Sequence, residues 1–244
     1  MTAADPGPAA SRGALVVSAP GASRAVAEAI GAALAAAGYA VRRGPVDGPA
    51  EDLVPGVPAG TRVVVHVAAP STPRAFLDRD PAGWTAELEA RIAAPIRLAR
   101  AAAPVLAATG GGALVFVGTL DATHAYPGHA DASVAMGALG GLVRSLAVEL
   151  APLGVRANAV LAGPFEPDVA PPAAGATGGG AADPSRVART LLRSPSGRFV
   201  APGEVAAAVA FVAGEGAAFM TGASLRVDGG WASLNQAPDG MRFP

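Results

Sequence analysis

The stretch ALVVSAPGASRAVAEAIGAAL, from Ala14 to Leu34, decides the fold of this chain. Its first residues, Ala14–Ser18, form a continuous apolar run of the kind found in strands that are covered on both faces. A Pro-Gly turn follows, and the alanine-rich segment Ser23–Ala37 after it has the pattern of a helix. Strand, glycine turn and helix in this order are typical of a βαβ unit around a parallel sheet.

The same alternation of apolar runs and alanine-rich segments continues along the chain. The predicted strands are Ala14–Ser18, Tyr39–Arg43, Arg62–Ala68, Ala113–Gly118, Arg156–Leu161 and Ser224–Val227. The predicted helices are Ser23–Ala37, Ala82–Ala108, Asp131–Leu150, Pro184–Leu192 and Gly203–Ala213. We therefore expect an α/β fold of one domain, a doubly wound Rossmann-like parallel sheet with helices on both faces.

This domain is expected to span residues 14–230, between a flexible N-terminal tail over 1–13 and a C-terminal tail over 231–244. Residues 166–182 are rich in glycine, proline and alanine, and they lie where a doubly wound sheet keeps its ligand-side loops. That segment is either a mobile lid over a site or an insertion without function.

Composition excludes several classes of protein. The chain has 244 residues, 51% of them hydrophobic, which is enough for one large core. Its net charge of −1 and the lack of a basic run argue against nucleic acid as a partner. It has neither cysteine nor lysine, so thiolate and lysine-amine chemistry are excluded. The uncharged run Ala101–Leu120 is broken by Pro104 and by glycines, and no signal peptide is recognisable, so we expect a cytoplasmic protein without a membrane partner.

Three stretches together resemble the short-chain dehydrogenase/reductase family over nearly the whole chain. They are Ala14–Leu34, GALGGLVRSLAVELAPLGVRANAVLAGPF from Gly137 to Phe165, and GRFVAPGEVAAAVAFVAGEGAAFMTGASLRVDGG from Gly197 to Gly230. The resemblance implies a Rossmann-like fold, NAD(P)-dependent oxidoreductases as relatives, and a homodimer or homotetramer. The family assembles through two long helices, here Ala82–Ala108 and Asp131–Leu150.

The part of the chain that matches the family's dinucleotide site departs from the pattern. The three glycines of the family's turn correspond to Gly21, Ala25 and Ala27, and methyl groups there crowd the approach of a pyrophosphate. Between the second and fourth family strands only residues 44–61 remain, too few for a helix, a strand and another helix. These residues therefore predict a vestigial site and no cofactor.

The catalytic positions depart further. The family's Ser, Tyr, Lys and Asn correspond to Thr119, Ala132, Met136 and Arg91, so that only a hydroxyl group is kept. This register predicts that the family's usual proton transfer by a tyrosine with a lysine beside it does not take place.

The emptied pocket nevertheless collects polar residues, including all three histidines of the chain. The candidate catalytic residues are Thr119, His66, Asp121, Arg91 and His129, because a histidine oriented by a carboxylate is suited to proton transfer. The candidate substrate-binding residues are Tyr126, Ala132, Met136, Phe165 and His124. No metal is expected, since the histidines lack a ligand spacing.

Each polar candidate also has a purely structural interpretation. His66, which follows the fourth family strand, could be bonded to the backbone at the end of a loop, and His124 and His129 could lie on a surface loop. Asp131 has the position of an N-cap for the long helix that it opens. Arg91 could pair with Glu87 four residues earlier.

Three functions remain open on the sequence alone. The first is a cofactor-independent cyclase, lyase or isomerase of specialised metabolism, acting by proton transfer on a small aromatic or polyketide-like molecule. The second is a non-catalytic subunit that pairs with an active homologue. The third is an NAD(P)-dependent oxidoreductase with an atypical active site.

Overall fold

The computed structural model describes residues 12–19, 21–44, 56–69, 71, 73–166, 188 and 190–234. In chain order its main elements are β1 (Gly13–Ser18), α1 (Arg24–Ala36), β2 (Ala40–Arg43), β3 (Thr61–Val67), α2 (Pro81–Leu88), α3 (Ala94–Ala108), β4 (Gly112–Thr119), α4 (Ala130–Leu150), β5 (Val155–Ala162), α6 (Pro202–Ala213) and β6 (Ser224–Val227). All six predicted strands are present, with ends that differ by at most one residue. The predicted loop 166–182, most of the helix Pro184–Leu192, and most of both tails lie outside the described residues.

The sheet has the strand order β2-β1-β3-β4-β5-β6, and each neighbouring pair is parallel. The chain leaves β1 for β2 on one side and then crosses to β3 on the other side, so the strand order reverses beside β1. In such sheets ligands bind next to this reversal, outside the carboxyl ends of the strands. The predicted doubly wound sheet is confirmed, and β2 is its edge among the described residues, as the short connection over 44–61 implies.

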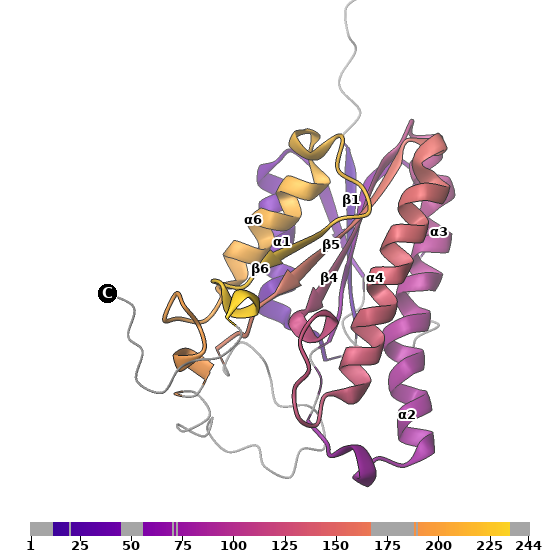
Figure 1. The fold of residues 1–244 in the computed structure, drawn as a ribbon. Coiled ribbons are helices and arrows are strands. Elements are labelled where there is room, and N and C mark those ends of the chain that lie inside the picture. Colours follow the sequence, from indigo (N-terminus) through magenta and orange to yellow (C-terminus); the bar gives the residue numbers. More distant parts are fainter. Residues whose placement is uncertain are drawn as a thin grey trace, which may run out of the picture.

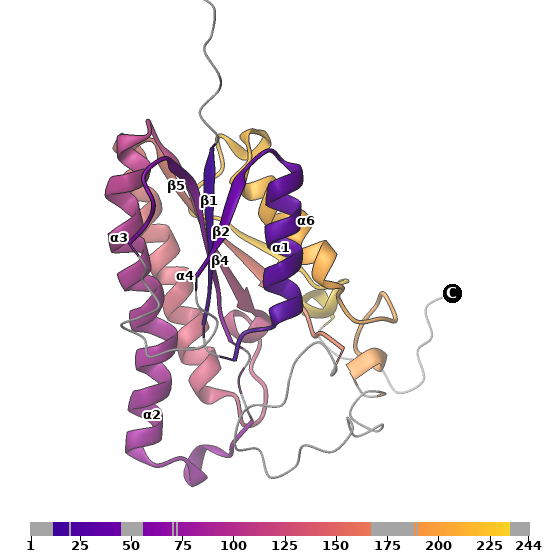
Figure 2. The same cartoon turned by 180° about the vertical axis from the view of Figure 1, so that it is seen from behind.

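Helices cover both faces of the sheet, α1 and α6 on one and α3 and α4 on the other (Figure 1, Figure 2). Neighbouring residues of β1 show why both faces of the sheet need a layer of helices. Val16 packs in the cluster that contains Ile30 of α1, whereas Val17 packs with Leu98 of α3. Since successive side chains of a strand point to opposite faces, a strand that is apolar at every position requires a helical layer on each side.

The predicted helix Ala82–Ala108 is one continuous helical stretch in the structure, but it contains a π-helical turn over Glu89–Ala93 between α2 and α3. Pro95 lies two residues after the end of this turn. Its ring lacks an N–H group and would collide with the carbonyl of Arg91 in a regular α-helix, which accounts for the wider turn. Arg91 lies inside that turn. In Figure 1, α2 extends beyond the ends of the strands.

Residues Ala130–Leu153 are long and apolar enough to cross a membrane when judged by length and composition alone. In this fold α4 packs along β5, and Ala135, Leu139 and Val143 are buried in the core. The core therefore accounts for part of the apolar character of the helix, since 28% of its most apolar stretch is buried. The run Ala101–Leu120 is divided between α3, a glycine turn and β4, as predicted.

Candidate active site

The carboxyl end of β4 brings a hydroxyl, a carboxylate and an imidazole together. Thr119 is the last residue of β4, Asp121 lies in the single 3₁₀ turn that follows, and His129 directly precedes α4. The Thr119 hydroxyl donates a hydrogen bond to Asp121 Oδ2 at 2.5 Å, and His129 Nδ1 lies 3.1 Å from Asp121 Oδ1. Three of the five predicted catalytic residues are thus in contact.

The contact between Asp121 and His129 is at ion-pair distance but poorly aligned for a hydrogen bond, and neither atom has another hydrogen-bond partner in the described part of the chain. Catalytic hydrogen bonds are often loose before substrate binds. Asp121 is buried, and a buried carboxylate requires donors, so we assign the Nδ1 proton to the side that faces Asp121. This assignment leaves Nε2 of His129 free to exchange a proton.

Tyr126 forms the next part of this wall. Its ring lies 5.7 Å from the His129 ring, centroid to centroid, and its hydroxyl accepts a hydrogen bond of 2.6 Å from Trp231 Nε1. Burial raises the pKa of Tyr126, and the negative charge of Asp121 raises it further, so the phenol stays protonated at neutral pH. Trp231 belongs to the predicted tail, and the sequence analysis missed its role. The signal available was a tryptophan placed directly after a predicted strand and a glycine turn.

Asp131 has another role than the one predicted. The N-cap position of α4 belongs to His129, which makes no side-chain cap, whereas Asp131 lies in the first turn with 1% of its side chain exposed. Arg79 Nη1 lies 3.2 Å from its carboxylate, and the Ser71 hydroxyl donates to both of its oxygens. The N-cap interpretation is therefore wrong, because the side chain is turned inward to a buried ion pair.

Arg91 pairs with Glu87, as the spacing of four residues predicts, with 2.7 Å between Arg91 Nε and Glu87 Oε2. Its Nη1 atom also donates to the carbonyl oxygen of Ala69 at 2.6 Å. The guanidinium group thus links the π-helical turn to the segment that follows β3. These contacts give Arg91 a structural role near the candidate site.

Neither of the other two histidines forms a hydrogen bond or ion pair with Asp121 in the described part of the chain. His66 lies within β3 and not after it, and the strand alternation turns it with Val64 toward the layer of α3 and α4. It is 4% exposed, its Nδ1 has no hydrogen-bond partner among the described residues, and burial lowers its pKa to about 4. His124 is exposed and contacts only its neighbour Thr123 through Nδ1 in the described structure. The three histidines do not form one cluster.

The predicted apolar wall divides in the same way. Ala132 and Met136 are buried in α4, and Met136 Sδ is so close to Gly118 that a Cβ atom there would lie 2.8 Å from it. Met136 thus lies at the end of β4 that carries Thr119, and neither Met136 nor Ala132 can exchange a proton. Phe165 packs against the cluster of the α1 and α6 layer, on the other face of the sheet.

The glycine turn after β1 keeps the features that a dinucleotide requires. Gly21 has φ +76°, a left-handed conformation that favours glycine, and a Cβ atom there would meet only the Ala69 side chain at 3.9 Å. The turn leads to the N-terminus of α1, where backbone N–H groups attract anions. The methyl group of Ala27 packs in the core, and Ala25 is exposed. The residues present therefore fit a pyrophosphate, and the expected crowding by Ala27 is wrong.

Two further residues escaped the sequence analysis. Arg42 and Arg43 are exposed at the carboxyl end of β2, about twenty residues after the glycine turn, where dinucleotide-binding folds recognise the ribose. An arginine near this position suits the 2′-phosphate of NADP, whereas an acidic residue suits NAD. Arg43 Nη1 lies 4.0 Å from Glu28, which also pairs with Arg24 at 3.0 Å.

Comparison with known proteins adds to this geometry. The family model described as enoyl-(acyl carrier protein) reductase matches residues 57–232, nearly three quarters of the chain. The chain is 33% identical over 174 residues to a cis-4-hydroxycyclohexanecarboxylate dehydrogenase of Sinomonas cyclohexanicum, covering 70% of this chain and 66% of that protein. It is 31% identical over 147 residues to the 3-oxoacyl-[acyl-carrier-protein] reductase FabG of Escherichia coli K12, covering 60% of this chain and 57% of that protein. The chain thus spans less than two thirds of the length of these relatives.

Solved structures share the architecture. The TT0495 protein of Thermus thermophilus is 29% identical, with a TM-score of 0.77 over 92% of this chain and all of that one. A structure from Agrobacterium tumefaciens with bound NADP has the same TM-score over 91% of this chain and 97% of that one, and at 24% identity it shows the fold alone.

A doubly wound sheet with a glycine turn at its strand reversal defines a dinucleotide-binding class of fold. Within that class, the chain belongs to the short-chain dehydrogenase/reductase superfamily, in the family described as enoyl-(acyl carrier protein) reductase. This family consists of enzymes.

The expectation of a cofactor-independent cyclase, lyase or isomerase is wrong, because the matched relatives are named dehydrogenases and reductases. The expectation of no cofactor is wrong for the same reason, since the absent glycines at Ala25 and Ala27 received too much weight. The non-catalytic subunit is not favoured by these names either.

Proposed function

We propose that this chain is an NADP(H)-dependent oxidoreductase that interconverts a ketone and a secondary alcohol, and that His129 exchanges the proton of the substrate oxygen. The observation that carries the proposal is the contact of His129 with the buried carboxylate of Asp121, beside the hydroxyl of Thr119. No tyrosine or lysine stands at the two buried positions Ala132 and Met136, so another group must move the proton.

When bound, the dinucleotide supplies or accepts the hydride. The turn at Gly21 and the N-terminus of α1 would hold its pyrophosphate, while Arg42 and Arg43 would attract the 2′-phosphate. Both features lie at the carboxyl edge of the sheet, as Thr119 does.

The proton steps belong to the chain itself. In the reducing direction, protonated His129 gives its Nε2 proton to the oxygen atom that gains negative charge, and in the oxidising direction neutral His129 removes that proton. Asp121 fixes the tautomer and stabilises the imidazolium. Thr119 is a positioning residue, because its hydroxyl binds one carboxylate oxygen of Asp121 and leaves the other facing His129.

The proposed substrate class follows from the names of the relatives. One relative is named for a cyclic hydroxy acid and another for a 3-oxoacyl group. Ala132 and Met136 are buried behind the end of β4, so the proposed apolar body of the substrate rests on these names. We therefore propose a carbonyl carried on an apolar body, and the first test substrates are an acetoacetyl thioester and 4-oxocyclohexanecarboxylate.

The test follows NADPH oxidation by the purified chain with these two ketones. We expect His129→Gln and Asp121→Asn to lower kcat by about 100-fold, the range of a lost general acid, with little change in NADPH binding. His124→Gln is the matched control, because this histidine is exposed and outside the cluster. Turnover that survives in His129→Gln would overturn the role of His129, and a lack of turnover with either ketone would overturn the substrate class.

Cofactor preference has a separate test by thermal shift. Because a ligand that binds the native state raises the melting temperature, we expect a larger shift with NADPH than with NADH. The variant with Arg42→Ala and Arg43→Ala should lose this difference and keep the response to NADH. Silence with both nucleotides would refute the proposed function.

We also propose that copies of the chain assemble through α3 and α4 in the cytoplasm. Ile96, Val134 and Val148 are large apolar side chains that lie exposed on these helices. Light scattering should report a dimer or a tetramer, and Val148→Glu should shift the distribution to smaller species.

A further inference from the structure

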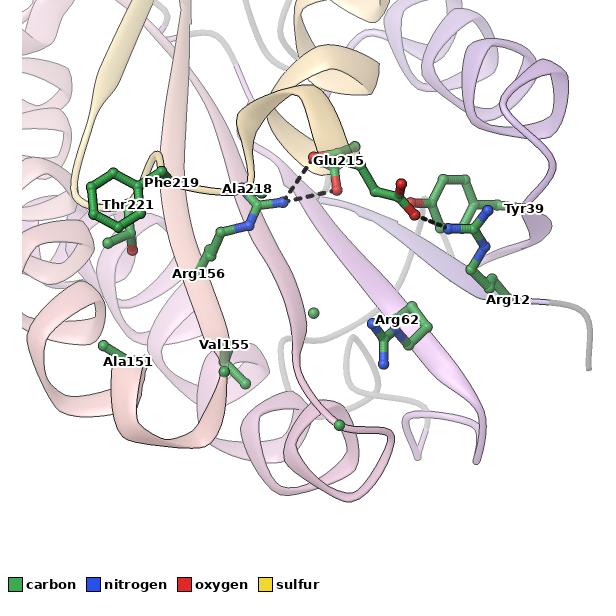
Figure 3. Close-up of a pocket in the computed structure, with 15 residues that line it drawn as sticks. Arg12, Tyr39, Arg62, Ala151, Val155, Arg156, Glu215, Ala218, Phe219 and Thr221 are labelled. Atoms are coloured by element: carbon green, nitrogen blue, oxygen red, sulfur yellow. Dashed lines mark hydrogen bonds and ion pairs between the residues drawn. The ribbon is translucent and has the colours of Figure 1, made fainter.

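The amino edge of the sheet, opposite the dinucleotide turn, contains a pocket of about 610 Å³ (Figure 3). This volume is in the range of small-molecule sites. The side chains that shape it come from residues at the beginning of strands and from the segment between α6 and β6. They are Arg12, Tyr39, Arg62, Arg156, Glu215 and Phe219. Nothing in the proposed reaction uses this edge.

One of the three arginines is fully committed to the fold. Arg156 Nη1 donates to the carbonyl oxygens of Val212 and Met220 at 2.7 and 3.3 Å. Its Nη2 donates to Ala213 and Gly214 at 3.0 and 3.2 Å. Arg156 thus satisfies carbonyl groups that the end of α6 leaves open, and it has no donor to spare at its two Nη atoms.

Arg62 is only partly used. Its Nη1 atom donates to the carbonyl oxygen of Thr109, and its Nε and Nη2 have no hydrogen-bond partner among the described residues. Figure 3 shows the guanidinium group directed into the middle of the pocket, between the side of Arg156 and the side of Arg12. A guanidinium with two adjacent free donors matches the paired oxygens of a phosphate or a carboxylate.

Arg12 provides a second positive charge on the other side of the pocket. Its Nη1 lies 2.9 Å from Glu215 Oε1, and its guanidinium lies 5.7 Å over the Tyr39 ring. The Glu215 side chain is 88% exposed, and exposed ion pairs of this kind are weak. Phe219 is fully exposed at the same pocket, an apolar surface without cover in the described structure.

We propose that this pocket is a second ligand site and that it binds a phosphate monoester with an apolar body. Arg62 anchors the phosphate with its two free donors, and the field of Arg12 adds attraction. The apolar body extends past Arg156 toward Phe219, which lies at the other end of the pocket (Figure 3). Glu215 opposes the ligand, because it neutralises Arg12 and brings a negative charge to the pocket. The proposal does not depend on the proposed reaction, since the two sites lie at opposite edges of the sheet.

The experiment is calorimetric titration of the full chain with phenyl phosphate, inorganic phosphate and phenol at pH 7.5. We expect phenyl phosphate to bind more tightly than either of its parts. Arg62→Met should weaken its binding by about tenfold or more, and Arg12→Met by about threefold. Glu215→Gln should strengthen binding by about threefold, because removal of this negative charge frees Arg12.

Arg100→Met, an exposed arginine of α3, is the matched control and should leave the affinity unchanged. Saturating NADPH should also leave it unchanged. Displacement of phenyl phosphate by NADPH would place the phosphate at the glycine turn and overturn the proposal, as would equal affinity in Arg62→Met and the native chain, or no binding at all. Glu215→Gln keeps the test decisive if Arg62→Met does not fold, because Glu215 is exposed and its removal must raise the affinity.

Discussion

The two edges of the sheet are both polar, but they use polar side chains differently. At the carboxyl edge, Thr119, Asp121 and His129 contact one another, and they come from a strand end, a loop and a helix start. At the amino edge, Arg156 binds backbone carbonyl groups at the end of α6. The polar side chains of the carboxyl edge thus contact one another, whereas the hydrogen bonds of Arg156 in the described structure go to backbone carbonyl groups.

This difference explains why the candidate reaction lies at one edge. A loop residue such as His129 can approach a substrate, and a buried carboxylate beside it tunes its chemistry. The arginine that closes α6 must remain in place whatever the enzyme binds. Arg62, half committed to the backbone and half free, is the exception at the amino edge.

The largest expected effect is on the free energy of unfolding, and it tests whether the ion pair of Arg79 with Asp131 at the carboxyl edge is buried in solution. Arg79→Met leaves the Asp131 carboxylate, of which 1% is exposed, without its cation. We expect the free energy of unfolding to fall by about 3–5 kcal/mol, as for other broken buried pairs, measured by urea denaturation. Arg24→Met is the control, because its pair with Glu28 is mostly exposed and should cost at most about 0.5 kcal/mol. Similar losses in both variants would contradict the distinction.

The next effect concerns pH. The pKa of His66 is about 4 in the folded chain and about 6.5 in the unfolded chain. The unfolded state therefore binds the proton first, and stability is lost as the pH falls from about 6.5 to about 4. The loss is about 3 kcal/mol, seen as urea denaturation midpoints along that pH range.

His66→Gln should remove this part of the pH dependence, because the amide that replaces the imidazole does not titrate. The comparison is therefore between slopes against pH and not between stabilities at pH 7. His124→Gln, which changes an exposed histidine, should keep the full slope. An unchanged slope in His66→Gln would show that this ring is protonated in the folded chain.

A smaller effect is expected at the amino edge. Arg156→Met removes hydrogen bonds to four carbonyl oxygens at the end of α6 and before β6. We expect a loss of about 2 kcal/mol in the free energy of unfolding, with no change in kcat. Arg100→Met should change neither quantity. A fall in kcat for the folded Arg156→Met variant would mean that the two edges are coupled.

The smallest effect sharpens the assignment of the proton. Tyr126→Phe removes the acceptor of the Trp231 hydrogen bond, which should cost about 1 kcal/mol of stability. If His129 moves the proton, kcat should stay within about threefold of the native value. A loss of about 100-fold would assign the proton to the Tyr126 phenol instead.

The local pattern of apolar runs and of residue spacing in the sequence predicts most of the fold. Strands β1, β3, β4 and β5 follow from mostly apolar runs, whereas β2 and β6 contain arginine and are partly exposed. The pair of Arg91 with Glu87 follows from a spacing of four residues on a helix. The π-helical turn was harder, because a proline near the middle of a helical pattern is compatible with a kink, a break or a wider turn.

The site was predicted less completely, for a reason that its residues make plain. Thr119 and Asp121 are neighbours in the chain, so their contact could be expected. The pair of Arg79 with Asp131 and the bond of Trp231 to Tyr126 join residues that are far apart in sequence. No periodicity connects such residues, and only the path of the chain across the sheet brings them together.

The order of apolar runs and glycine turns in this sequence determines a doubly wound parallel sheet, because such strands need helices on both faces. The absence of lysine and cysteine determines which catalytic groups are unavailable. Which histidine meets a carboxylate is a matter of three-dimensional packing. His66 faces the core and loses its charge there, while His129 meets Asp121, because the strand alternation and the loop before α4 direct the two rings to different surroundings.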